Sequence, residues 1–179
     1  MSSKFINTVD QFGDEAVFNS IVEGTITELK DDTITTIASN CLTYLYGFLT
    51  KVDCPNATSI KASALNYNYD MKYVRTKANK IENGAFQAGY SLTAVILCGD
   101  TVCQLMHTNA FANCLHYHGT VQATYNKEGL KDGYIYVPRA LVEDYKVATN
   151  WTTLASQFRA IEDYTVDGTI YGELDESKI

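Results

Sequence analysis

The stretch KIENGAFQAGYSLTAVILCGD, residues 80–100, decides the fold because it has the pattern of one self-contained module. A short apolar turn leads to Phe86, and a few loosely patterned residues follow. Leu92, Val95 and Leu97 then supply the apolar positions of a short segment that is typical of a β-strand. The stretch therefore predicts one strand and one loose or 3₁₀ segment, a unit that cannot bury its apolar side alone.

Two earlier stretches of the chain repeat this apolar pattern. Successive isoleucines, at positions 37, 60 and 81, lie 60 − 37 = 23 and 81 − 60 = 21 residues apart. A period of about 20 to 29 residues is that of leucine-rich repeats. The aligned columns are Ile37, Ile60 and Ile81; Leu42, Leu65 and Phe86; Leu49, Met71 and Leu92; and Val52, Val74 and Val95. A fourth, partial copy begins at Leu105 or Met106 and adds Phe111 to the column of Phe86.

Stacking of these copies predicts an α/β solenoid of about three and a half repeats. Strand then lies beside strand in parallel, and the isoleucine and phenylalanine columns form ladders inside the stack. The alternative is an irregular α+β domain in which the similarity between copies arose by chance. Agreement in four columns over three copies favours the repeat.

The two ends of the chain carry patterns that are typical of caps over the terminal copies of a stack. We expect an N-terminal segment with a capping helix over 1–24, and repeats over 25–137 that end in a closing strand at Tyr134–Val137. A helical cap is predicted over 138–162. An Asp-Gly pair between two alternating runs predicts a β-hairpin and tail over 163–179, a candidate anchor to a partner.

Two helices are predicted within this C-terminal cap. The first spans RALVEDYK and pairs Leu141 with Tyr145 at i,i+4. The second follows Thr149 or Asn150 as its N-cap. Its apolar face has the i, i+3, i+4, i+7 pattern and consists of Trp151, Leu154, Ala155 and Phe158.

The composition limits the class of partner. The chain has 179 residues, of which 46% are hydrophobic and 20% charged, with a net charge of −7. An acidic surface repels phosphate backbones, so no nucleic-acid partner is expected. No apolar run approaches about 18 residues and no secretory signal pattern opens the chain, so no membrane insertion is expected. Five irregularly spaced cysteines predict reduced, buried thiols rather than a disulfide framework.

Four stretches resemble the BspA-like leucine-rich repeat proteins of bacteria and their phages. They are IENGAF, SLTAVILCGDT, TNAFANC and YIYVPRALVEDYKVATNWTTLASQFRAIE. The likeness is strongest from Ile81 to Phe111 and from Tyr134 to Glu162. The two ends of the chain look most like short phage and prophage versions from gut Firmicutes, which sit among virion structural genes. The resemblance implies a virion protein that is made in the host cytoplasm.

The sequence holds one sparse metal-ligand pattern. Cys114, His116 and His118 stand at i, i+2 and i+4, so on a strand they would share one side and suit zinc. A fourth ligand would have to come from His107 or Cys103. The alternative is a buried cysteine and two loop histidines. No catalytic residue, resident metal or cofactor is expected, since no known catalytic motif is present.

Tyrosines alternate with asparagines in the early copies. Both residue types are adaptable contact residues that are common where a surface binds protein or sugar. The alternative is that the rings pack the convex side of the solenoid, because tyrosine is amphipathic. The candidate binding residues are Tyr44, Tyr46, Tyr67, Tyr69 and Tyr73.

Together these patterns predict a non-enzymatic repeat module, and the resemblance implies that it belongs to a virion as a capsid decoration, head fibre or tail-associated protein. Its repeat stack would present a strand face and tyrosine-rich loops to a bacterial surface protein or glycan. One terminus would anchor it to other virion proteins or to a sister subunit as a homo-oligomer. The alternative is an adhesion or protein-interaction module of the bacterial cell surface.

Overall fold

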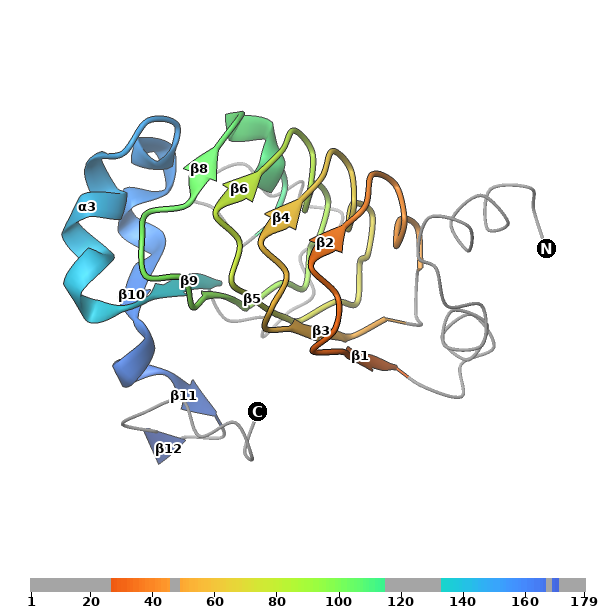
Figure 1. Ribbon diagram of the computed structural model, residues 1–179, viewed down its shortest axis with the longest axis horizontal. Coiled ribbons are helices and arrows are strands. Elements are labelled where there is room, and N and C mark those ends of the chain that lie inside the picture. The colour runs from red at the N-terminus through yellow and green to blue at the C-terminus, as the bar shows by residue number, and fades with distance from the viewer. Residues whose placement is uncertain (1–26, 46–48, 115–132, 167–168, 171–179) are drawn as a thin grey trace.

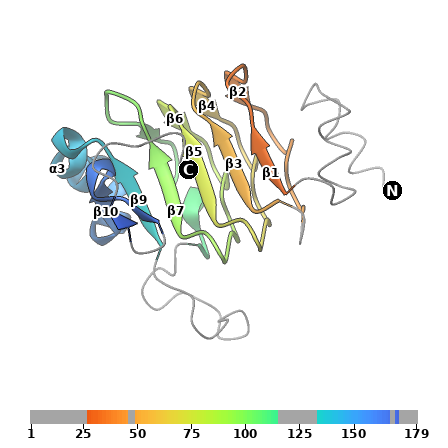
Figure 2. The same ribbon diagram turned by 90° about the horizontal axis from the view of Figure 1, so that it is seen from below.

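The chain builds two parallel sheets that lie one above the other (Figure 1). The computed structural model describes residues 27–45, 49–114, 133–166 and 169–170, and the helix predicted within 1–24 lies outside them. The six-stranded sheet, seen from its outer side in Figure 2, has the order β1 (Glu28–Lys30), β3 (Lys51–Cys54), β5 (Tyr73–Thr76), β7 (Ala94–Leu97), β9 (Tyr134–Val137) and β10 (Phe158–Ala160). The four-stranded sheet has the order β2 (Thr36–Ile37), β4 (Ser59–Ile60), β6 (Lys80–Ile81) and β8 (Gln104–Leu105).

The strands pair in the register of the sequence columns. In the six-stranded sheet Val74 pairs with Val52 on one side and with Val95 on the other. In the four-stranded sheet Ile60 pairs with Ile81. All pairs within both sheets are parallel. The prediction of an α/β fold with strands stacked in parallel is therefore confirmed.

Each of the three aligned stretches contributes two strands, where the sequence pattern predicts one. The isoleucine column lies in the four-stranded sheet and the valine column in the six-stranded sheet. Leu92, which was expected within a strand, precedes β7, which begins at Ala94. Each strand of the four-stranded sheet has two residues. So short a strand cannot display the alternation of apolar and polar residues by which strands are recognised.

The main core lies between the two sheets and follows the repeat columns. Phe86 and Phe111 stack with their ring centroids 5.0 Å apart, and Phe111 lies 5.6 Å from Trp151. Backbone bonds follow the same ladder, since the Phe86 amide donates to the Ala110 carbonyl at 2.8 Å. The residues predicted for the repeat core expose at most 3% of their surface; they are Ile37, Leu42, Val52, Ile60, Leu65, Val74, Ile81, Phe86, Leu92, Val95, Leu97, Phe111, Trp151 and Phe158.

The C-terminal end of the stack is closed by η3 (Arg139–Leu141), α3 (Val142–Val147) and η4 (Trp151–Gln157) (Figure 1). These elements satisfy the backbone at the edge strand β8, which would otherwise lack partners. The Cys103 amide donates to the Tyr145 hydroxyl at 2.8 Å, and Trp151 Nε1 donates to the Cys103 carbonyl at 2.6 Å. Asn150 Nδ2 donates to the Leu105 carbonyl at 2.8 Å. Three side chains of the cap thus take the place of a fifth strand.

The prediction of a second α-helix in this cap is wrong. Residues 151–157 form the 3₁₀ helix η4, and Phe158 begins β10, which pairs in parallel with β9. The Phe158 ring still enters the main core, 5.6 Å from Trp151. The apolar spacing therefore identifies three buried side chains correctly, Trp151, Leu154 and Phe158, whereas Ala155 is only half-buried and lies outside the core. The backbone becomes a strand because β9 offers an edge whose hydrogen-bonding groups need a partner.

The chain then leaves the stack through η5 (Ile161–Asp163). Strands β11 (Thr165–Val166) and β12 (Thr169–Ile170) pair antiparallel with each other, as the Asp-Gly pattern predicts. Residues 167–168 and 171–179 lie outside the described residues. In the described ranges no helix has the length and apolar character that crossing a membrane requires.

Candidate functional site: a tyrosine row along the turns

The turns that return the chain from the four-stranded to the six-stranded sheet contain two columns of left-handed residues. Such residues have positive φ, a region that favours glycine and then asparagine. The first column consists of Asn40, Ser63 and Gly84. The second column consists of Tyr44, Tyr67, Ala88 and Asn113, with φ between 56° and 61°. The columns recur at the repeat step, so the turn geometry itself is repeated.

Tyrosine is an energetically unfavourable residue type at the left-handed positions of the second column. A left-handed residue with a Cβ costs roughly 1–2 kcal/mol because the Cβ crowds the following carbonyl oxygen. Tyr44 and Tyr67 have this strained conformation, with φ of 61° and 56°. At the equivalent position of a later turn the chain has Asn113, a residue type that tolerates positive φ. Strained residues persist where something else in the molecule requires them, often at functional sites. Tyr44 and Tyr67 are therefore the first candidates for a site.

These two tyrosines belong to a continuous row of rings. Tyr44 and Tyr67 stack with centroids 4.6 Å apart and planes 6° from parallel. Tyr69 lies 6.4 Å from Tyr67, and Tyr90 lies 5.0 Å from Tyr69. All four side chains are half-buried. We call Tyr44, Tyr67, Tyr69 and Tyr90 the tyrosine row.

Buried amides between the tyrosines hold the turns in place. Asn68 is fully buried, and its Nδ2 donates to the carbonyls of Leu42 at 2.7 Å and Leu65 at 2.9 Å. Its Oδ1 accepts from the Leu45 amide at 3.0 Å. Asn66 accepts a hydrogen bond from the Thr43 hydroxyl through its side-chain oxygen. The asparagines are thus part of the scaffold, and the tyrosines are the part of the pattern that reaches the surface.

The predicted binding residues do not all belong to this row. The structure brings together Tyr44, Tyr67 and Tyr69, while Tyr46 lies outside the described residues. Tyr73 is a correction: it lies in β5, exposes 8% of its surface and packs on the far side of the six-stranded sheet. Tyr90 was missed, although it lies 90 − 69 = 21 residues after Tyr69 and so repeats its column.

The metal pattern is not assembled in the described chain. Cys114 is buried, and its thiol donates to the Phe111 carbonyl at 3.0 Å. His116 and His118 lie outside the described residues. Within the described ranges, no three His, Cys, Asp or Glu side chains are grouped as a metal site would require. Cys114 is accounted for as a core residue.

Four of the five cysteines are thiols of the core, and Cys98 is half-buried outside it. Burial raises the pKa of Cys41, Cys54 and Cys103 to about 12 and raises that of Cys114 still further. A protonated thiol is a poor nucleophile and a poor metal ligand. These four buried cysteines therefore behave as small apolar side chains.

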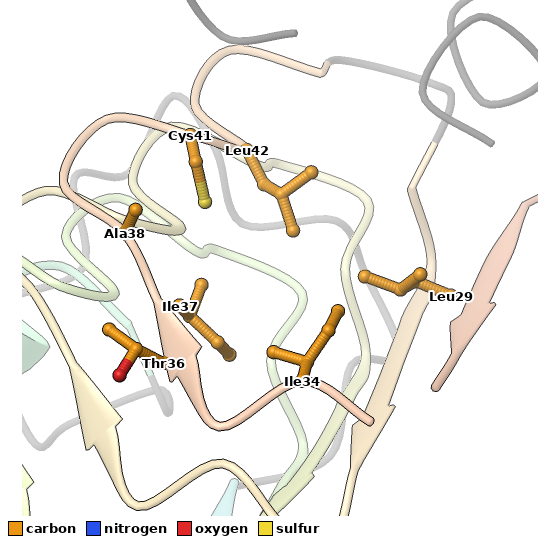
Figure 3. Close-up of a pocket in the computed structure, with 7 residues that line it drawn as sticks. All are labelled: Leu29, Ile34, Thr36, Ile37, Ala38, Cys41 and Leu42. Carbon is orange, nitrogen blue, oxygen red and sulfur yellow. The ribbon is translucent and has the colours of Figure 1, made fainter. Parts of the chain in front are cut away.

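A hollow at the β1–β2 end of the stack is too small for a ligand. Its volume is about 20 Å³, which is close to the space that one water molecule needs. Figure 3 shows Leu29, Ile37 and Leu42 pointing into it. Among the described residues, this hollow therefore offers no room for a ligand.

A scan against protein-family models, a search of curated proteins and a search of solved structures each find no match. Function has to be inferred from the geometry of the chain itself.

Proposed function

We propose that the chain is a non-enzymatic, BspA-like leucine-rich repeat protein of a phage particle. A solenoid of about three and a half repeats would display a binding surface to the host cell. The in-register parallel strands and the ladder of buried rings support this architecture. On the particle the protein would serve as a capsid decoration, head fibre or tail-associated protein.

The left-handed tyrosines carry this proposal. Tyr44 and Tyr67 occupy a position where Asn113 serves the same turn without the same strain. The turn geometry gives no reason for a large aromatic side chain there, so the rings themselves are the useful feature. The placement of these two stacked rings at strained, left-handed positions is the single observation on which the binding role rests.

The row has the physical properties of a contact surface. Tyrosine offers a flat apolar ring with a hydroxyl at its edge, and it loses little conformational entropy because it has two side-chain torsions. The buried Asn68 network fixes the turns before a partner arrives, which lowers the ordering cost of binding. A sugar ring or an apolar protein side chain fits such a surface. A phosphate backbone does not suit a chain of net charge −7.

Binding can be tested with a variant that keeps the turn geometry. We expect Tyr44→Asn with Tyr67→Asn to fold, because asparagine tolerates positive φ. Purified protein would be titrated onto intact cells and wall polysaccharide of gut Firmicutes, and the double variant should bind at least about tenfold more weakly. Ser63→Asn is the matched control, since Ser63 has φ 56° in the other column and carries no ring. Equal binding by the double variant and the unmodified protein would show that the tyrosine row does not contribute to binding.

The particle role has its own test. Mass spectrometry of purified phage particles should detect the chain among the virion proteins. Its absence from particles, together with its presence on intact bacterial cells, would replace the phage assignment with a cell-surface adhesion module. The binding experiment on the tyrosine row would stand in either case.

A further inference from the structure

An uncharged cleft lies between the edge strand β8 and the loop that joins α3 to η4. Figure 1 shows β8 as the strand of its sheet that lies next to the C-terminal cap. The cleft has a volume of about 390 Å³, within the range of about 300–1,000 Å³ that is typical of ligand sites. Its walls are residues 102–106 and 148–151, and we call it the edge cleft. All of these residues are uncharged in a chain of which 20% is charged, so the edge cleft suits an uncharged occupant.

The Leu105 amide is a backbone donor at the edge cleft. The Gln104 amide donates to the Asn79 carbonyl at 2.8 Å, and the Met106 amide donates to the Ile81 carbonyl at 2.9 Å. Because successive residues of a strand direct their backbone groups to opposite sides, the Leu105 amide between them points away from β6 and toward the cap. Leu105 exposes 3% of its surface, and its amide donates to no acceptor in the described ranges. Such an amide costs free energy, so an acceptor that a ligand brings to it stabilises the complex.

Asn150 supplies a hydrogen-bond acceptor beside the same residue. Its Nδ2 donates to the Leu105 carbonyl at 2.8 Å, which leaves Oδ1 as the other end of the side-chain amide. This Oδ1 accepts from no donor in the described part of the chain. Asn150 has φ 66°, a conformation that asparagine tolerates. Leu105 and Asn150 together therefore offer one donor and one acceptor, as a free strand edge offers to an added peptide.

The borders of the edge cleft are apolar. Met106 lies in one wall and exposes 44% of its surface, and Val147, which adjoins the other wall, exposes 77%. Single exposed apolar residues are common on a protein surface and need no explanation. Here, however, both large apolar residues that the described ranges expose lie at one uncharged cleft. They provide apolar contact for the side chains of an occupant.

We propose that the edge cleft binds a short, extended and uncharged peptide segment of another protein. A backbone carbonyl of the segment accepts from the Leu105 amide, and a backbone N–H donates to Asn150 Oδ1. Its apolar side chains contact Met106 and Val147. The backbone groups of Cys103 are already bonded to side chains of the cap, so the pairing with β8 is limited to Leu105 and the segment is short. The edge cleft contains no residue of the tyrosine row, so this proposal is independent of the proposed function.

A synthetic peptide tests the proposal on the full-length protein. The probe is a hexapeptide of alternating threonine and valine, capped at both ends so that it carries no charge. Binding is followed by the NMR shift of the Leu105 amide and by the fluorescence of Trp151, the single tryptophan of the chain. We expect both signals to change and to saturate at millimolar peptide. The same peptide with lysine in place of valine should bind at least about tenfold more weakly, because it brings charge where the cleft offers apolar contact.

Two variants locate the binding. Asn150→Gly removes the side-chain amide and keeps the left-handed backbone, which glycine adopts readily, so affinity should fall at least about tenfold. Asn40→Gly is the matched control: it makes the same change at φ 57°, near the opposite end of the stack, and should bind as the unmodified protein does. Met106→Lys brings a charge to the border of the cleft and should also weaken binding at least about tenfold, which keeps the test valid if Asn150→Gly fails to fold.

Three results would overturn the proposal. The first is a Leu105 amide signal that the uncharged hexapeptide leaves unchanged. The second is equal affinity of the Asn150→Gly and Asn40→Gly proteins or, if the former does not fold, of the Met106→Lys and unmodified proteins. The third is a different occupant: saturable binding of maltohexaose at Leu105 in place of the peptide, or a dimer in native mass spectrometry that Met106→Lys abolishes and the peptide does not displace.

Discussion

The strain at the left-handed tyrosines can be measured by comparing glycine with alanine at two positions. Tyr67 has φ 56°, and Tyr69, two residues later in the same row, is not among the positive-φ residues. Either replacement removes the ring and its stacking, so that loss is common to both variants at a position. At position 67 alanine keeps the left-handed penalty of roughly 1–2 kcal/mol, and glycine relieves it.

The conformational entropy of the unfolded chain acts against glycine at both positions by about 0.4–1 kcal/mol. At position 67 glycine should therefore be the more stable variant by about 0.5–1 kcal/mol. At position 69 alanine should be the more stable by about the entropy difference alone, ~0.4–1 kcal/mol. The entropy cancels in the difference between the two positions, which leaves the strain itself, roughly 1–2 kcal/mol.

The assay is urea unfolding of the four single variants, followed by circular dichroism and compared at equal m-value. The reasoning is refuted if alanine is more stable than glycine at Tyr67 by the same margin as at Tyr69. That outcome would mean that tyrosine at position 67 carries no backbone strain. The argument for its functional role would then be lost.

Three further changes test the architecture. Trp151→Phe keeps a ring in the core but leaves the Cys103 carbonyl without its donor at 2.6 Å, so urea titration should report a loss of about 1–3 kcal/mol of unfolding free energy. Arg75→Met leaves the carboxylate of Asp53 buried and unpaired and should cost about 3–5 kcal/mol, whereas the double variant with Asp53→Leu should recover most of this in a double-mutant cycle. Burial raises the pKa of three core thiols from 9.0 to about 12, so above pH 9 the unfolded chain binds fewer protons than the folded chain and unfolding free energy falls as pH rises. Between about pH 9 and 10, where each buried tyrosine contributes less than a thiol does, the part of the fall due to the thiols should be about 1 kcal/mol per thiol. The fall should become smaller by that amount for each of these thiols that is replaced by alanine, and the share of Cys114, whose pKa is also raised by burial, should remain; the replaced thiols are Cys41, Cys54 and Cys103.

The register of both sheets is predictable because the ladders repeat the same chemistry. Val74 lies between Val52 and Val95, and Ile60 lies beside Ile81, so alignment of like residues is also alignment of strands. The division into two sheets is not predictable from the same pattern, since a two-residue strand leaves no periodic signal.

The C-terminal cap illustrates a different limit. Of the four side chains that the spacing from Trp151 to Phe158 selects, all except Ala155 enter the core. It fails to select the backbone conformation, because β9 presents an unpaired edge that only a strand can satisfy. That edge exists only after the stack has formed, so no local pattern contains it.

The residues of the candidate site could be predicted only in part from the sequence, for a similar reason. The alternation of Tyr67, Tyr69 and Tyr73 looks like one surface in the sequence. However, β5 begins at Tyr73, and its ring packs on the side of the six-stranded sheet that lies away from the main core. The left-handed turn has a signal that can be read: the column that holds Tyr67 also holds Asn113, the residue type that tolerates positive φ. An aromatic residue that shares a column with asparagine indicates a strained turn.

The packing of Tyr164 on the outward side of the six-stranded sheet also decides where a displayed surface can lie. The sequence leaves two candidates, the strand face of the stack and its tyrosine-rich turns. On the strand face Ile96 exposes none of its surface and Tyr136 exposes 9%, with Tyr164 packed against them as part of the same cluster. A partner could reach those residues only after the segment at Tyr164 has moved. The tyrosine row is half-buried along the turns and needs no such opening. If the protein binds a host ligand while its own chain remains closed, the ligand must meet the turns, and loss of Tyr164 should leave that binding unchanged.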